Sequence, residues 1–163
     1  MHRTPSYTVL LVGEGQTELA FLKHLKSLYI SRGCGVAVKI ISTNGKGPEF
    51  IVNYTIRRSH RIASDRILTL LDGDIPITPR IRKKARQHHI ELVESSPCFE
   101  GLLIKIIDKP VPATSKKCKK ICRNYFDGSL TQQSTYNNLT LKTLERRRNC
   151  IPELAQILDS FIF

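Results

Sequence analysis

The sequence contains no apolar run long enough to cross a membrane, since a spanning helix needs about 20 predominantly apolar residues. We also expect no leader of the secretory type. The first apolar run covers residues 9–12, and Gly13, Glu14 and Gly15 interrupt it before a signal peptide could form. We therefore expect a cytoplasmic protein without a membrane partner.

The sequence also lacks a Cys-x-x-Cys pair, and its five cysteines are odd in number and irregular in spacing. Cys118 and Cys122 lie one turn apart on an expected helix and, with His88 and His89 earlier in the chain, leave zinc as an alternative. Structural zinc sites usually need four well-spaced ligands. Reduced thiols in a cytosolic protein are the better interpretation.

Acidic residues are scarce. The chain has 14 Asp and Glu against 26 Lys and Arg, which gives a formal net charge of +12. A charge of this sign attracts polyanions and speeds their association. We expect nucleic acid as the partner, because clustered basic residues are its usual electrostatic counterpart. Docking on an acidic protein is the alternative.

Two of these scarce acids stand together at the end of an expected strand. Residues 68–71 form an apolar or β-branched run, typical of a buried strand, and Asp72, Gly73 and Asp74 follow directly. Ligands of open parallel sheets gather beyond the carboxyl ends of the strands. The two carboxylates therefore predict a cation site, and a solvated turn is the alternative.

The start of the chain repeats this arrangement. Residues 9–12 end at Glu14 within a glycine turn, and Thr17 is a fair N-cap for the helix that follows. Strands are expected at residues 7–12, 35–42, 66–71 and 90–94, with helices between them. This alternation predicts an α/β fold with a four-stranded parallel sheet. Placing Glu14 beside Asp72 and Asp74 requires the order 2-1-3-4, with helices on both faces.

The composition changes after Asp108. We expect a Rossmann-like domain over residues 1–108, followed by a basic linker and helical extension over residues 109–163 that packs on it. In that extension, helices are predicted at residues 115–126 and from Pro152 onward. The polar residues 127–138 between them predict a mobile loop.

Three short motifs occur in a recognisable order. They are Gly13-Glu14-Gly15-Gln16-Thr17-Glu18, Asp72-Gly73-Asp74 and Ser95-Ser96-Pro97-Cys98-Phe99-Glu100. Over residues 7–107 the chain resembles a Toprim domain, shared by topoisomerases, bacterial primases and the OLD family of nucleases. It looks most like the RloB branch of small Toprim proteins found in bacterial defence and restriction loci. The resemblance implies phosphodiester chemistry, a role in antiviral defence and an ATPase partner.

The resemblance implies that Glu14 is a metal ligand or the proton-handling group. Mg²⁺, or Mn²⁺ in its place, suits oxygen-only sites with one or two carboxylates. Some Toprim domains carry a third acid soon after the aspartate pair, but residues 75–78 contain none. Glu100, and less so Glu18, could take its place, although Glu100 could equally be a first-turn helix acid. The predicted metal ligands are Glu14, Asp72, Asp74 and Glu100.

Basic side chains complete the predicted site. Lys105 is a candidate for stabilising developing negative charge, and a solvated helix lysine is the alternative. The loop of residues 43–48 lacks the ending of a P-loop, and we interpret it as a turn in which Lys46 is a candidate phosphate contact. The predicted nucleic-acid-binding residues are Arg80, Arg82, Lys83, Lys84, Arg86, Lys116, Lys117, Lys119 and Lys120.

These features together predict a magnesium-dependent endonuclease that cleaves DNA or RNA, with tRNA among the candidates. One alternative is a Toprim module that binds nucleic acid or a partner protein without cutting. Another is a nucleotidyl transferase, which the missing triphosphate loop disfavours. A homodimer stays open as the oligomeric state.

Overall fold

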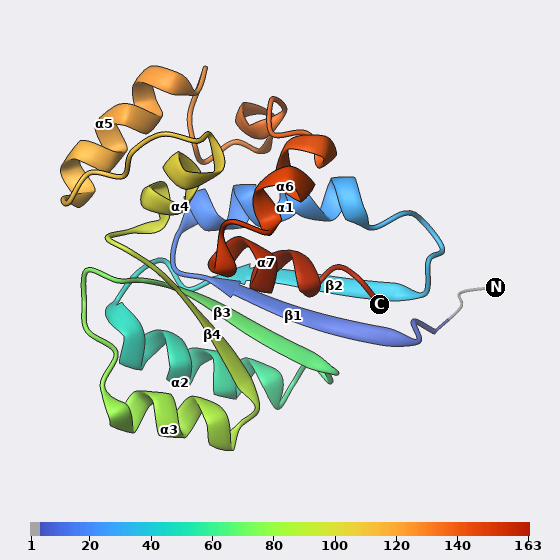
Figure 1. Cartoon of the computed structure of the whole chain (residues 1–163). Helices are drawn as coiled ribbons and strands as arrows, with labels where there is room; N and C mark the ends of the chain where they lie inside the picture. Colours follow the sequence, from blue (N-terminus) through green and yellow to red (C-terminus); the bar gives the residue numbers. More distant parts are fainter. Residues whose placement is uncertain (1–3) are drawn as a thin grey trace.

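Four apolar runs form one parallel sheet in residues 4–163, the part of the chain that the computed structural model describes (Figure 1). The spatial order is β2-β1-β3-β4, which confirms the predicted order. The strands are β1 (Tyr7–Gly13), β2 (Val36–Ser42), β3 (Arg66–Asp72) and β4 (Ile90–Ser95).

Helices cover both faces of the sheet, as predicted. Side chains alternate between the faces along a strand, so Leu11 of β1 packs in one apolar cluster with Phe21, whereas Leu10 packs in another with Ile51. One face is covered by α1 (Gln16–Tyr29) and α4 (Phe99–Ile106), and the other by α2 (Gly47–Ser59) and α3 (Pro79–Gln87) (Figure 1). None of the described helices is long and apolar enough to span a membrane.

The second helix ends earlier than the sequence predicts. Its apolar side chains, which include Val52, Ile56 and Ile62, predict a helix from Glu49 to about residue 63, but α2 spans Gly47–Ser59. The next segment is fastened to the sheet: the N–H of Thr8 donates to the Asp65 carboxylate at 2.7 Å, and the N–H of Asp65 donates to the Thr8 carbonyl at 2.9 Å. The helix therefore has to end several residues before Asp65, so that the chain can connect to β3.

The C-terminal segment packs on the α1 and α4 side (Figure 1). Its buried residues Cys122, Leu144 and Leu154 belong to the same apolar cluster as Phe21 and Leu11. One hydrophobic core thus joins residues before and after Asp108. The segment consists of α5 (Ser115–Tyr125), the 3₁₀ turn η1 (Gln133–Tyr136), α6 (Leu141–Arg148) and α7 (Pro152–Asp159).

The polar segment of residues 127–138 is anchored by one aromatic residue. Tyr136 is fully buried, its ring lies edge-on to Phe21, and its hydroxyl donates to the Leu130 carbonyl at 2.7 Å. His24 of α1 hydrogen-bonds the Leu139 carbonyl just beyond the segment, at 2.8 Å. The expected mobile loop is therefore attached to the core near its C-terminal end.

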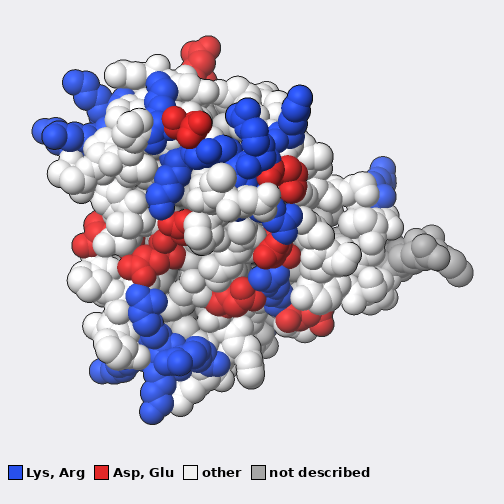
Figure 2. Space-filling view, viewed as in Figure 1, with Lys and Arg blue, Asp and Glu red and all other residues white. Residues whose placement is uncertain are grey.

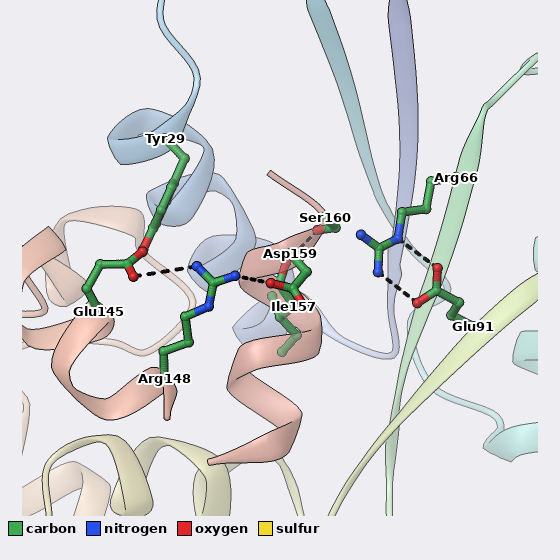
Figure 3. Close-up of polar contacts among 8 residues, drawn as sticks. All are labelled: Tyr29, Arg66, Glu91, Glu145, Arg148, Ile157, Asp159 and Ser160. Carbon is green, nitrogen blue, oxygen red and sulfur yellow. Dashed lines mark hydrogen bonds and ion pairs between the residues drawn. The ribbon is translucent and has the colours of Figure 1, made fainter. Parts of the chain in front are cut away.

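Polar contacts also connect the last two helices to α1 (Figure 3). The Tyr29 hydroxyl donates to Glu145 of α6 at 2.6 Å, and burial together with that carboxylate raises the Tyr29 pKa. Arg148 bridges Glu145 and Asp159 of α7. The same view shows Arg66 of β3 donating two hydrogen bonds to Glu91 of β4.

Because the core is continuous, we expect Leu154→Ala to lower the free energy of unfolding of the whole chain by about 2–5 kcal/mol. Leu154 is 0% exposed, whereas Leu141, on the neighbouring α6, is 45% exposed, so Leu141→Ala is the matched control and should change little. Urea denaturation of both variants measures the effect. A separate transition for the C-terminal helices, with the sheet domain unchanged, would contradict a single core.

Candidate functional site

Two acids meet where the first and third strands end. Glu14 lies in the turn after β1, and Asp72 is the last residue of β3. The two strands are parallel neighbours, with Val12 opposite Thr69, so their carboxyl ends adjoin. The N–H of Asp72 points at the Glu14 carboxylate, with 3.5 Å between nitrogen and oxygen. This is the switch point of the sheet, where the sequence predicted the site.

An open pocket of about 260 Å³ lies over this point and contains four carboxylates. Glu14 and Asp72 are joined there by Glu18 of α1 and Glu100 of α4, which are 6% and 8% exposed. The residues lining the pocket are Glu14, Gly15, Thr17, Glu18, Asn44, Gly45, Asp72, Phe99, Glu100 and Lys119.

Backbone N–H groups at two helix starts orient these acids. The N–H of Phe99, the first residue of α4, donates to Asp72 Oδ1 at 2.8 Å. The N–H of Gly15, which caps α1, donates to Glu18 Oε2 at 3.2 Å. Helix N-termini favour negative charge because their first N–H groups are unpaired and the helix dipole is positive there. Both helices therefore direct their anion-binding ends at the acid pocket.

Two glycines allow the acids to come this close. A Cβ atom on Gly13 would lie 2.8 Å from Glu18 Cβ, closer than such atoms approach. A Cβ atom on Gly73 would lie 3.1 Å from the Ser95 carbonyl oxygen, where the turn after Asp72 crosses the end of β4. The glycines beside Glu14 and Asp72 thus permit close approach of the backbone.

Burial and mutual repulsion keep protons on the acids. Burial, followed by the charges of Glu100 and Glu14, raises the pKa of Glu18 to about 7. Burial, followed by the charges of Glu18 and Glu14, raises the pKa of Asp72 to about 7. The pKa of Glu14 is raised chiefly by burial, with Asp74 adding to it. At neutral pH the pocket therefore favours a bound proton or a bound cation.

Asp74 and Lys105 lie outside this pocket. Asp74 is exposed, although it is near enough to raise the pKa of Glu14. Lys105 Nζ forms an ion pair with Glu153 of α7 at 2.6 Å, and Arg147 donates to the Lys105 carbonyl at 2.9 Å. The geometry thus gives Lys105 a role in joining α4 to the C-terminal helices, in place of the charge-stabilising role that the sequence predicted.

Glu18 and Lys119 line the pocket, whereas Asp74 and Lys105 do not. Glu18 had only a secondary place in the prediction, because an acid in the first turn of a helix has an ordinary structural explanation. Lys119, predicted as a nucleic-acid contact, reaches the pocket from α5. Within residues 4–163 it forms no ion pair with an acid. The predicted metal ligands Glu14, Asp72 and Glu100 are brought together, and Asp74 lies at their edge.

Basic side chains gather over α5 and over α3, with acidic side chains between them (Figure 2). On α3, Arg80 pairs with Glu49 at 3.2 Å and Arg82 pairs with Glu94 at 2.8 Å. The lysines of α5 form no such pairs in the described chain. They are Lys116, Lys117, Lys119 and Lys120, all exposed.

Three thiols are buried between α4 and α5. Cys98, Cys118 and Cys122 are free, and burial raises the pKa of Cys98 and Cys122 to about 12. Across residues 4–163, no three His, Cys, Asp or Glu side chains are placed so that they could hold a metal ion together. The zinc alternative therefore gains no ligand set, and these thiols serve as apolar packing between the two helices.

Comparison with known proteins gives no match among family models, curated proteins or solved structures.

The raised carboxyl pKa values predict how stability depends on pH. Between about pH 4 and 7 the folded protein holds protons on Glu18 and Asp72 that the unfolded chain releases, so their stabilising contribution is complete at the acid end and is lost as pH rises to about 7. Metal-free wild type should lose on the order of 3 kcal/mol of unfolding free energy per group over this window, because each unit of pKa shift corresponds to about 1.4 kcal/mol. The Glu18→Gln variant should lack the part of this pH dependence that the Glu18 carboxyl group contributes.

Urea denaturation at a series of pH values in EDTA measures this dependence. Repeating the series with Mg²⁺ should recover stability above pH 7, since a ligand of the folded state stabilises it. Equal pH dependence in wild type and Glu18→Gln would show that Glu18 does not titrate in this window.

Proposed function

We propose that the protein is a metal-dependent endonuclease of the Toprim type, close to the RloB branch, that hydrolyses phosphodiester bonds of DNA or RNA. The observation that carries this proposal is the convergence of four carboxylates in one open pocket at the switch point of the sheet. Glu14, Glu18, Asp72 and Glu100 come from four separate elements, and among the described residues that line the pocket one lysine faces them.

The donor set fits Mg²⁺ or Mn²⁺. All four side chains offer oxygen, and Mg²⁺ is typically held by one or two carboxylates with several waters. Asp72 is the best-oriented candidate ligand, because one of its oxygens is fixed by the Phe99 N–H and the other is left for a ligand. Glu14 and Glu100 are its partners in the pocket. Because no three acids of the described residues are placed to ligate one ion together, either of them would serve as a second ligand or act through a water. A bound divalent ion would offset the negative charge of a phosphodiester and activate water.

The other residues of the pocket then take separate tasks. Glu14 is only partly buried and its pKa is raised, which suits proton transfer at its Oε atoms. Lys119 supplies positive charge for a phosphate oxygen, the task that the sequence assigned to Lys105. Glu18 sits deepest beside the start of α1 and holds the proton or counter-charge that keeps the acids together.

The basic surfaces support nucleic acid as the substrate. The net charge is +12, and basic side chains gather over α5, which brings Lys119 to the pocket, and over α3 (Figure 2). On α3, Arg80 and Arg82 have carboxylate partners, whereas Lys83, Lys84 and Arg86, like the four lysines of α5, have none among the described residues. We place the phosphate contacts nearest the reacting group on α5, because this helix brings Lys119 to the pocket. The choice between DNA and RNA is left to the cleavage assay.

Antiviral defence and an ATPase partner complete the proposal and rest on the resemblance alone, and a homodimer stays open. A module that binds nucleic acid without cutting it is the second candidate function, favoured by the extent of basic surface relative to the pocket. The two candidates differ in one observable, which is whether the acids are needed for binding or for cleavage.

We expect Asp72→Asn to abolish Mg²⁺-dependent cleavage while the protein stays folded. Binding in EDTA should hold or tighten, because the change removes a negative charge that faces a polyanion. Asp74→Asn is the comparison: Asp74 lies at the edge of the pocket and should retain partial activity. A panel of DNA and tRNA substrates with Mg²⁺ or Mn²⁺ provides the measurement. Wild-type binding without cleavage across this panel would favour the binding module.

A matched lysine pair tests the corrected position of the cation. Lys119→Gln should lower the cleavage rate by about 10²-fold, as expected for loss of one charge-stabilising group. Lys105→Gln removes the same charge from a lysine already paired with Glu153 and should leave the rate close to that of wild type. Single-turnover rates at saturating enzyme separate this effect from binding. The reverse order of effects would restore Lys105 to the site.

A further inference from the structure

The outer face of α2 carries two stacked rings between two cations. Phe50 and Tyr54 lie one helical turn apart, with ring centroids 6.2 Å apart and planes inclined by 25°. Lys46 Nζ lies 4.9 Å from the Phe50 ring centroid, and the Arg57 guanidinium lies 5.9 Å from that of Tyr54. We call these four residues the α2 stripe. Both rings are partly exposed and both cations are exposed.

The stripe begins at the acid pocket. Lys46 directly follows Asn44 and Gly45, which line the pocket. The N–H of Gly45 donates to the Glu14 carbonyl at 2.7 Å, and Gln16 donates to Asn44 at 2.9 Å, so this loop is fastened to the turn that carries Glu14. From Lys46 the helix runs back along the sheet toward the opposite end (Figure 1). The stripe therefore extends from the pocket along the side of the molecule.

The order of side chains matches an unpaired nucleic-acid strand. Exposed aromatic rings stack on bases, and neighbouring cations contact the phosphates, a combination typical of single-strand binding surfaces. A duplex hides the faces of its bases and cannot use the rings in this way. An acidic protein segment would need the cations alone.

Helix stability accounts for only part of this arrangement. Aromatic pairs four residues apart stabilise a helix by themselves, and that would explain the contact between Phe50 and Tyr54. The helix dipole also favours Arg57 in the last turn of α2, but it disfavours a cation at the N-cap, where Lys46 lies. Neither Lys46 nor Arg57 forms an ion pair with an acid in the described residues, and Glu49, the acid of α2, is already paired with Arg80.

We propose that the α2 stripe binds single-stranded nucleic acid, with bases stacked on Phe50 and Tyr54 and phosphates held by Lys46 and Arg57. The proposal rests on the proposed function in one respect, which is that the bound strand continues into the acid pocket as substrate. It adds a substrate class: an unpaired strand, or an unpaired segment of a folded RNA.

The test measures binding without metal, so that cleavage plays no part. A fluorescein-labelled single-stranded oligonucleotide and the matching duplex are titrated in EDTA with wild type and with the double variant Phe50→Leu, Tyr54→Leu. Leucine keeps an apolar side chain and good helix propensity but cannot stack on a base. Single-strand affinity should fall about tenfold, and duplex affinity should be unchanged.

The control is Phe163→Leu. Phe163 is 58% exposed and contacts Tyr7, away from α2, so its loss should leave both affinities unchanged. Base stacking is followed separately with 2-aminopurine in the strand, whose fluorescence should be quenched by wild type and less so by the double variant. Unchanged single-strand affinity, or an equal loss for strand and duplex, would overturn the proposal.

A second double variant covers the case in which the ring substitutions disturb folding. Lys46→Gln with Arg57→Gln leaves the rings in place and should reduce the salt dependence of single-strand binding by about 0.7 for each phosphate that the variant no longer neutralises. An unchanged slope would also overturn the proposal. A protein that binds single strands through α2 but cuts nothing would refute the proposed nuclease and leave this inference standing, so the two failures are distinguishable.

Discussion

Repulsion among Glu14, Glu18, Asp72 and Glu100 is the constraint on which the rest of the site depends. Carboxylates in a partly buried pocket cannot all ionise without compensation, and burial first, then the charges of the neighbouring acids, raise the pKa values of Glu18 and Asp72. The fold supplies part of the compensation from backbone, because the starts of α1 and α4 direct N–H groups at Glu18 and Asp72. A proton or a divalent ion supplies the remainder.

The C-terminal extension takes part in this arrangement. The buried thiols of α5 pack against α4, which fixes the helix whose start orients Asp72 and presents Glu100. The same packing brings Lys119 to the pocket. Lys105, on the far end of α4, is used to join that helix to α7 through Glu153. The two lysines have different surroundings because Lys119 lies on the part of α5 that borders the pocket, whereas Lys105 lies at the end of α4 that is distant from it.

The strand order could be predicted from sequence because chemistry demanded it: Glu14 and Asp72 can meet only if the first and third strands are neighbours. Local sequence patterns could not show which of the other acids line the pocket. Glu18 and Glu100 both look like first-turn helix acids, and only burial in the fold separates them from ordinary caps. Asp74 shares a motif with Asp72, yet the turn at Gly73 leaves it exposed. Tyr136 carried no sequence signal, since a lone aromatic in a polar segment becomes a core residue only through contacts distant in the chain.

In the proposed function, the acid pocket and the basic surfaces act on the same substrate in opposite ways. A metal-free pocket of four acids repels a phosphodiester, so affinity for a polyanion must come from elsewhere on the molecule. The cations of α5 lie on one side of the pocket, and the α2 stripe begins at the loop on its other side. A strand held at both places would cross the acids between them. Stacking on Phe50 and Tyr54 adds an attraction that salt does not screen, whereas the lysines act through charge and weaken as salt rises. In this arrangement the acids contribute little to holding the strand and are left free for chemistry, which explains why a strongly basic chain would place its few buried acids in one pocket.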